Sequence, residues 1–206
     1  MLTSKSLRDV ISAFASSEPT PGGGSASALA SSIGASLLLM VARLERTRNQ
    51  SDEDRTALAF ATGALTGTLH QLTEAIDADS AAYGHVVSAY RQPKASDSEQ
   101  TATKAAIERA LRTATDVPLG VMRLSVDAVK HAQAVAAHGH RAASSDVGVA
   151  LALLQAGLEG ARLNVRINLG GLSDRGYIEA VTAESERLSG RMSGLVRDAI
   201  AAMGGG

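Results

Sequence analysis

The chain of 206 residues has no cysteine, no tryptophan and very few aromatic residues. Without cysteine there is no disulfide framework, no thiolate nucleophile and no cysteine-based zinc site. Aromatic residues make up 2% of the chain and hydrophobic residues 45%, so the core must be built from Ala, Leu, Val and Ile. So few rings leave no stacking surface for single-stranded nucleic acid. A net charge of -1 gives no general attraction to a polyanion, and we expect no nucleic-acid partner.

The sequence also shows no hydrophobic run that we expect to span a membrane. The most apolar stretch, residues 33–42, is too short to cross a bilayer. The N-terminal segment is amphipathic, unlike the apolar region of a secretory signal. We therefore expect a cytoplasmic protein without membrane contact, folded as a single domain over residues 1–206.

Helical periodicity dominates the sequence, and strand signals are missing. The predicted fold is therefore all-α, an up-and-down bundle of long helices. Pro118 is expected to kink or split the fourth helical region. The predicted helices are residues 3–16, 25–44, 52–90, 97–137, 147–169 and 174–203. The expected N-caps of the last four are Ser51 or Asp52, Ser96 or Asp97, Ser145 or Asp146, and Ser173 or Asp174.

Three consecutive glycines, Gly22, Gly23 and Gly24, stand directly before the second predicted helix. A glycine-rich helix start gathers unpaired N–H groups at the positive end of the helix dipole, which suits an anion or a polar ligand. The alternative is a flexible hinge. The pattern is not a P-loop, because the Gly-Lys-Ser/Thr ending is missing, and no strand precedes it as in a Rossmann fold. The helix that follows has small residues on every face, which predicts the central helix of the bundle.

A carboxylate lies on the apolar face of the third predicted helix. At 100° per residue, Asp79 falls within the apolar stripe, one turn before Tyr83. Asp77 falls on the opposite face and is expected to be an ordinary solvated residue. Burial raises the pKa of a carboxyl group and suits it to general acid or base catalysis near neutral pH. The alternative is a structural aspartate that caps or bonds another helix.

Two amides and two histidines are further polar candidates. Asn164 and Asn168 lie one turn apart on a small-residue face of the fifth predicted helix. They could bridge helices or line a ligand site that includes Asp79. His138 and His140 are only a weak metal signal, because no set of carboxylates accompanies them, and we expect no metal.

Four blocks of the sequence occur in an order that resembles one family. They are PTPGGGSASALASSIGASLLLMV, LTEAIDADSAAYGHVVSAYRQPK, ATDVPLGVM and SDVGVALALLQAGLEGARLNVRINLGGLSD. Over residues 2–202 the chain resembles the cyclodeaminase/cyclohydrolase family, which comprises the C-terminal domain of formiminotransferase-cyclodeaminase and stand-alone methenyltetrahydrofolate cyclohydrolases. The resemblance implies an all-helical fold, a homodimer and a tetrahydrofolate derivative as substrate, with no tightly bound cofactor.

The resemblance also implies roles for individual residues. The second acid of the Asp-Ala-Asp motif, Asp79 here, corresponds to the family's catalytic aspartate. The family's Pro-Gly-Gly-Gly-Ser motif matches residues 21–25, and its Asn-Val-x-Ile-Asn motif matches residues 164–168. The expected substrate-binding residues are Gly22, Gly23, Gly24, Ser25, Tyr83, Asn164, Asn168 and Arg43.

The chain departs from the family pattern after residue 42, where RLERTRN places charged residues beside the expected pocket. Arg43, Arg46 and Arg48 could meet the glutamate tail of a folate or simply complement the helix dipole. Three functions stay open. The first is a folate enzyme that hydrolyses methenyltetrahydrofolate to formyltetrahydrofolate or, alternatively, releases ammonia from formiminotetrahydrofolate. The second is an enzyme of this fold with a non-folate substrate, and the third is a non-catalytic helical module. The glycine motif and Asp79 favour an enzyme.

Overall fold

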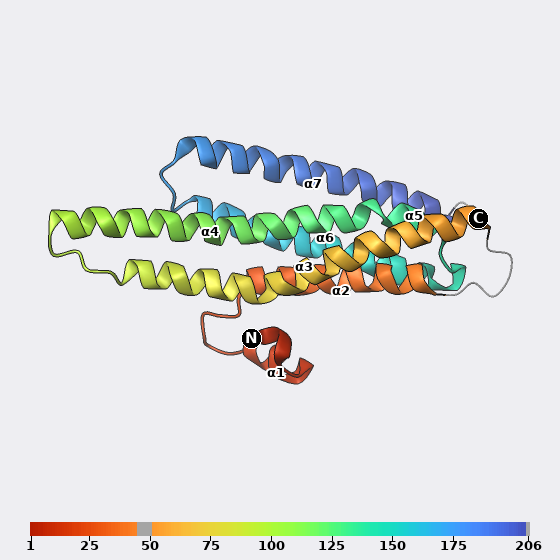
Figure 1. The fold of residues 1–206 in the computed structure, drawn as a ribbon, viewed down its shortest axis with the longest axis horizontal. Helices are drawn as coiled ribbons and strands as arrows, with labels where there is room; N and C mark the ends of the chain where they lie inside the picture. The colour runs from red at the N-terminus through yellow and green to blue at the C-terminus, as the bar shows by residue number, and fades with distance from the viewer. Residues whose placement is uncertain (45–50, 205–206) are drawn as a thin grey trace.

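The structure is a computed structural model that describes residues 1–44 and 51–204. Every regular element in these ranges is helical, and Figure 1 shows long helices running side by side. This confirms the predicted all-α bundle. In chain order the elements are η1 (Leu2–Ser4), α1 (Leu7–Phe14), α2 (Gly23–Arg43), α3 (Asp52–Tyr90), α4 (Asp97–Lys130), α5 (Ala132–His138), η2 (Arg141–Ala143), α6 (Ser144–Leu169) and α7 (Arg175–Gly204).

Side-chain caps define where three of the long helices begin. Ser51 accepts a hydrogen bond from the N–H of Asp54, and the Asp54 carboxylate accepts one from the N–H of Ser51. Ser96 and Glu99 form the same capping box at α4. Asp174 accepts a bond from the N–H of the third residue of α7. The expected helix starts are therefore confirmed at these three positions.

Other boundaries differ from the prediction. α2 begins two residues early, so that Gly23 is already helical, and α6 begins at Ser144 without a side-chain cap. Residues 3–16 form two elements, η1 and α1, rather than one helix. Of the two expected effects of Pro118, a kink or a split, the split is wrong, because α4 continues through Pro118 to Lys130 and the helical region breaks at His131 instead. An interior proline costs about 3 kcal/mol, and the packing of α4 against α3 and α6 offsets this cost.

α2 is the central helix, and it packs closely against α6. A Cβ atom at Gly157 of α6 would lie 2.0 Å from the Ser31 hydroxyl oxygen and 2.7 Å from the main-chain oxygen of Ser27. The Ser31 hydroxyl also bonds that of Ser125 in α4, at 2.8 Å. The small residues of α2 thus allow backbones to approach closely, as predicted.

α2 is long and apolar enough to cross a membrane by length and composition alone, with a mean hydropathy of 1.7. The apolar stretch is therefore longer than residues 33–42. Because 61% of it is buried inside the bundle, we interpret α2 as a core helix.

The N-terminal elements lie on the side of the bundle opposite α7 (Figure 1). Asp77 of α3 holds them, since its carboxylate accepts hydrogen bonds from the N–H of Leu2 and from the hydroxyl of Thr3, the latter at 2.6 Å. Burial alone would raise the pKa of Asp77, but the bonds from Thr3 and Leu2 outweigh it and lower the pKa. The prediction that Asp77 is an ordinary solvated residue is therefore wrong, because η1 covers its face of the helix.

Candidate active site

A cavity of about 280 Å³ opens beside the N-terminal end of α2. Its walls combine glycine backbone, apolar side chains, one carboxylate and two amides. All predicted site residues line it except Ser25 and Arg43. The lining residues are Pro19, Thr20, Gly22, Gly23, Gly24, Asp79, Tyr83, Val86, Ala114, Asn164, Ile167 and Asn168.

Asp79 reaches from α3 to the first turn of α2. Its Oδ2 accepts hydrogen bonds from the N–H of Ser25 at 2.8 Å and from the Ser25 hydroxyl at 3.1 Å. Asp79 therefore caps α2 from a neighbouring helix, which satisfies one N–H that a helix start leaves unpaired. Its Oδ1 has no hydrogen-bond partner within residues 1–44 and 51–204, and this oxygen is not buried away from solvent. One oxygen thus holds α2 while the other remains available to the cavity.

The surroundings of Asp79 change its affinity for a proton. Burial raises the pKa of this carboxyl group, and the hydroxyl and N–H of Ser25 oppose the shift only in part. Asp79 therefore keeps its proton at higher pH than a solvated aspartate does. A carboxyl group with a raised pKa can serve as a general acid and, once ionised, as a general base.

Ser25 lies behind the carboxylate rather than in the cavity. It is fully buried, and its hydroxyl lies within hydrogen-bond distance of three oxygens: Asp79 Oδ2, the main-chain oxygen of Ile76 at 2.9 Å and the Ser80 hydroxyl at 3.1 Å. These contacts place Ser25 where it orients Asp79. The structure does not bring it into the cavity as a substrate-binding residue.

The glycines bring the backbone of α2 against both polar groups of the cavity. A Cβ atom at Gly24 would lie 2.0 Å from Asp79 Oδ1, and one at Gly23 would lie 3.3 Å from the amide nitrogen of Asn164. The first intrahelical bond of α2 comes from Ala26, so the N–H groups of Gly23 and Gly24 precede it and have no partner in the described part of the chain. Two N–H groups without a partner therefore lie at the start of α2, where Gly24 approaches the carboxylate and Gly23 approaches Asn164.

The two asparagines of α6 also line the cavity. Asn164 donates from its amide nitrogen to the main-chain oxygen of Gly160 in its own helix, at 2.8 Å. Asn168 donates to the main-chain oxygen of Ala114 in α4, at 2.6 Å. The sequence left two roles open for Asn168, a bridge between helices and a residue that lines the site. Asn168 fills both, because it connects α6 to α4 and lines the cavity.

This arrangement can be compared with known proteins. The profile described as formiminotransferase-cyclodeaminase matches residues 6–187. The chain belongs to this family. The predicted resemblance is thereby confirmed over most of the chain, including the segments that carry the glycines, Asp79 and both asparagines.

Relatives of two kinds occur within the family. The methenyltetrahydrofolate cyclohydrolase of Methylorubrum extorquens is 38% identical over 188 residues, which cover 91% of this chain and 90% of the relative. The formimidoyltransferase-cyclodeaminase of Gallus gallus is 30% identical over 85% of this chain, but the match spans only 32% of that longer protein. The crystal structure of formiminotetrahydrofolate cyclodeaminase from Thermotoga maritima has a TM-score of 0.87 and 24% identity over 100% of this chain and 98% of its own. This last likeness confirms the fold.

Arg43, which the sequence predicted to bind substrate, does not line the cavity that holds Asp79. It lies in the last turn of α2, whose 21 residues separate it from the glycines by about 30 Å at 1.5 Å per residue. Its guanidinium donates to the Thr66 hydroxyl of α3, at 3.2 Å. Arg46 and Arg48 lie outside the described residues.

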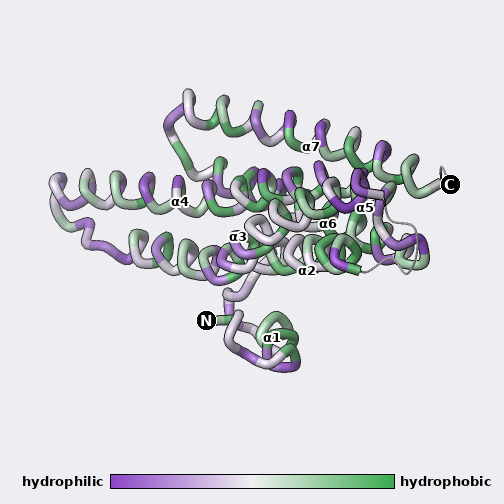
Figure 2. Tube along the Cα trace, turned by 45° about the vertical axis from the view of Figure 1, so that its right-hand side comes forward, coloured by the Kyte–Doolittle hydropathy of each residue, from purple (hydrophilic) through white to green (hydrophobic). Residues whose placement is uncertain are grey.

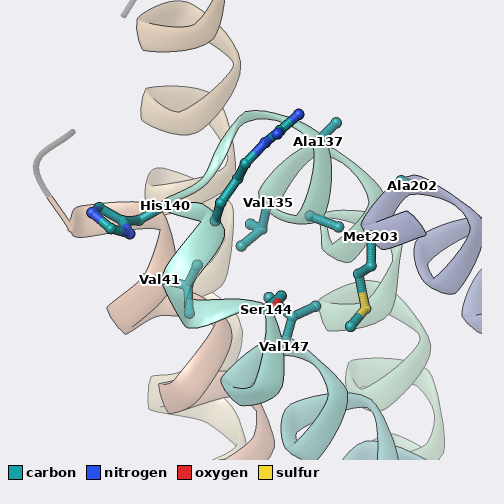
Figure 3. A pocket seen from close by; sticks show the side chains of 10 residues that line it. Val41, Val135, Ala137, His140, Ser144, Val147, Ala202 and Met203 are labelled. Carbon is teal, nitrogen blue, oxygen red and sulfur yellow. The ribbon is translucent and has the colours of Figure 1, made fainter. Parts of the chain in front are cut away.

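A second cavity, of about 310 Å³, lies at the end of α2 that carries Arg43. Figure 3 shows its apolar floor, where Val41, Val147 and Met203 come from α2, α6 and α7. His140, Arg141 and Ser144 add polar groups to its lining, and no carboxylate lines it. Without an acid or base of that kind, this cavity lacks the chemistry present at Asp79.

The histidines predicted to be weak metal candidates have other partners. His138 Nδ1 pairs with the Asp54 carboxylate at 2.6 Å, and His140 Nδ1 accepts from the N–H of Ala142 at 3.2 Å. Among the described residues, no group of three or more His, Cys, Asp or Glu side chains could hold a metal ion.

The sequence interpretation missed several parts of the site. Ala114, Val86 and Ile167 line the cavity as ordinary small or apolar residues, which no motif distinguishes. The contact of Asn168 with Ala114 did have a signal. Ala114 is four residues before Pro118, and a proline leaves the carbonyl at that spacing without its helical donor.

Proposed function

We propose that this chain hydrolyses methenyltetrahydrofolate to formyltetrahydrofolate, with Asp79 as the general acid and base. The observation that carries the proposal is the state of the Asp79 carboxyl group. One oxygen is held by Ser25, the other is available to the cavity, and burial raises the pKa. The 38% identity with a methenyltetrahydrofolate cyclohydrolase over nearly the full length of both chains supports it.

The reaction needs one group that moves a proton in both directions. Water adds to the electron-poor carbon that bridges two nitrogens of the substrate. The Asp79 carboxylate takes a proton from this water, and a tetrahedral intermediate forms. The carboxylic acid then gives this proton to the nitrogen that leaves. As the C–N bond breaks, the hydroxyl group of the intermediate releases its proton to solvent and becomes the formyl carbonyl, so the carboxyl group ends as it began.

The walls of the cavity suit a folate. Tyr83, Val86 and Ile167 provide apolar surface for a flat ring. The free N–H groups of Gly23 and Gly24 can donate to oxygen atoms of the substrate or to developing negative charge. A tetrahydrofolate derivative enters as substrate, and the proposal requires neither a metal nor a tightly bound cofactor.

Cyclodeamination is the second candidate. The relatives from Gallus gallus and Thermotoga maritima carry that activity in their names. On the same scaffold, Asp79 would protonate the departing ammonia while the ring closes. A non-folate substrate is the third candidate, and it rests on the charged residues after residue 42, of which 45–50 lie outside the described structure.

A spectrophotometric assay with two substrates separates these candidates. We expect the enzyme to remove the absorbance of methenyltetrahydrofolate faster than the uncatalysed reaction and to leave formiminotetrahydrofolate unchanged. Turnover of formiminotetrahydrofolate alone, with ammonia released, would assign the cyclodeaminase. Turnover of neither substrate would contradict the folate proposal and favour a non-folate substrate.

We also infer that the chain forms a homodimer. In support, α1 lies apart from the long helices and carries hydrophobic residues (Figure 2), of which Leu7 is 69% and Ile11 is 61% exposed. On α2, Ile33 and Met40 are also exposed, at 44% and 40%. An amphipathic helix normally buries its apolar face, and a second copy of the chain would cover these residues.

Light scattering tests the dimer. At micromolar concentration we expect a mass twice that of one chain. The double variant Leu7→Asp/Ile11→Asp should shift the mass towards one chain, whereas Arg8→Asp, a charge change between the two, should not. A wild-type protein that scatters as a monomer under these conditions would rule the dimer out.

A further inference from the structure

Pro118 lies in the interior of α4, a helix of 34 residues. Proline has no N–H, so it cannot donate to the carbonyl four residues earlier, which belongs to Ala114. The side chain of Asn168 supplies the missing donor, because its amide nitrogen lies 2.6 Å from the main-chain oxygen of Ala114. The proline and the asparagine are therefore coupled across α4 and α6.

This contact determines which way the Asn168 side chain faces. A carbonyl oxygen can only accept, so the amide nitrogen must face Ala114 and the amide oxygen must face away. The same reasoning holds for Asn164, whose nitrogen donates to the main-chain oxygen of Gly160. Within the described residues neither amide oxygen accepts a hydrogen bond, and neither oxygen is buried away from solvent. Both side chains line the cavity, so the pair offers it two acceptors.

Two acceptors one helical turn apart suit a group with two diverging donors. Residues at this spacing lie about 5–6 Å apart at Cβ, and the two N–H bonds of a primary aromatic amine diverge in one plane. The pterin ring of a folate carries one such group, its 2-amino group. The glutamate tail, by contrast, presents mainly acceptor oxygens, which these amide oxygens would not bind.

We propose that Pro118 is a positioning residue that fixes the amide of Asn168, and that the oxygens of Asn164 and Asn168 bind the 2-amino group of the pterin ring. The inference rests on the proposed folate substrate and names the residues that select it. It leaves Asp79 free to act at the bridging carbon. It also explains an unfavourable residue in the middle of a helix, since sequences depart from local preferences chiefly at functional sites.

Two probes test the contact with the amine. They are 5-formyltetrahydrofolate and its 2-desamino-2-methyl analogue, in which a methyl group replaces the amine. We expect the wild-type protein to bind the first at least about tenfold more tightly, and Asn168→Leu to reduce this preference by about tenfold. Binding of neither probe would contradict the proposed function. Equal binding of both would overturn the inference alone.

The role of Pro118 has its own variants. Pro118→Ala and Pro118→Ser restore an N–H that can bond Ala114 and release Asn168. We expect each to weaken the preference for the amine about tenfold without lowering the thermal midpoint. Adding Asn168→Leu should reduce it no further, because both changes remove one interaction. Pro93→Ala, in the turn between α3 and α4, is the matched control and should keep the full preference.

Pro118→Ser keeps the test valid if Pro118→Ala fails to fold. A Pro118 variant that melts like the wild type and keeps the full preference, while Asn168→Leu loses it, would overturn the positioning role. A Pro118 variant that weakens the binding of both probes equally would also overturn the positioning role, because a general loss of packing does not distinguish an amine from a methyl group.

Discussion

Asp79→Asn is expected to lower turnover of methenyltetrahydrofolate by at least ~100-fold, because general acid–base groups typically contribute ~100- to 10,000-fold. Asparagine keeps the size of the side chain and an oxygen that can accept from Ser25, so α2 stays capped. It cannot take a proton from water or return one to a leaving nitrogen. Steady-state kinetics with parallel binding of 5-formyltetrahydrofolate should show that kcat falls while binding persists.

The same substitution has a predictable effect on stability. Because burial raises the pKa of Asp79, the folded state favours the neutral carboxyl group. That stabilisation is present at pH below the pKa of the unfolded chain and is lost as pH rises through the folded-state pKa. Removing the ionisable group should therefore not lower the thermal midpoint at neutral pH. As the pH rises from about 4 towards about 7, the thermal midpoint of the variant should increase relative to that of the wild type. Thermal melting in steps of about one pH unit measures this.

Asp77→Asn is the matched control for this prediction. Asp77 is two residues away on the same helix, but its carboxylate holds Leu2 and Thr3 rather than facing the cavity. We expect a lower thermal midpoint with nearly unchanged kcat. Equal and small effects of the two substitutions on kcat would contradict the assignment of Asp79 as the acid and base.

Much of the fold could be predicted from the sequence because the helices are long and amphipathic. Periodicity and caps such as Ser51 and Ser96 locate helix starts from residues that are neighbours in the chain. Pro118 was harder to interpret, since its effect on α4 depends on packing with α3 and α6. The role of Asp77 could not be predicted, because its partners are more than 70 residues away, at the N terminus.

The candidate site was predictable in part for a related reason. The helical wheel places Asp79 on an inward face, and the family motifs add the glycines and asparagines. Neither source separates residues that line a cavity from those behind it, so Ser25 and Arg43 could be placed only from the three-dimensional structure. The direction of an amide side chain likewise depends on its hydrogen-bond partner, which for Asn168 lies in another helix.

Gly24→Ala is expected to lower kcat/KM by ~100-fold, because small displacements of a catalytic group can cost that much. A Cβ atom at this position would lie 2.0 Å from Asp79 Oδ1 and 2.4 Å from the carboxyl carbon. The carboxyl group must therefore move, or α2 must move away from α3. Helix preference alone predicts the reverse, since alanine is about 1 kcal/mol more favourable than glycine inside a helix. Steady-state kinetics and thermal melting of the same samples measure the two effects separately.

Two further glycines make the comparison quantitative. A Cβ at Gly23 would lie 3.3 Å from the amide nitrogen of Asn164, a tight contact with a side chain that can shift, so Gly23→Ala should mainly raise KM. A Cβ at Gly190 in α7 would meet no atom within 4 Å, so Gly190→Ala should leave kinetics unchanged. The expected order of lost activity is Gly24, then Gly23, then Gly190. If Gly24→Ala instead retained full kcat/KM, the close approach of α2 to Asp79 would not be what positions the carboxyl group for catalysis.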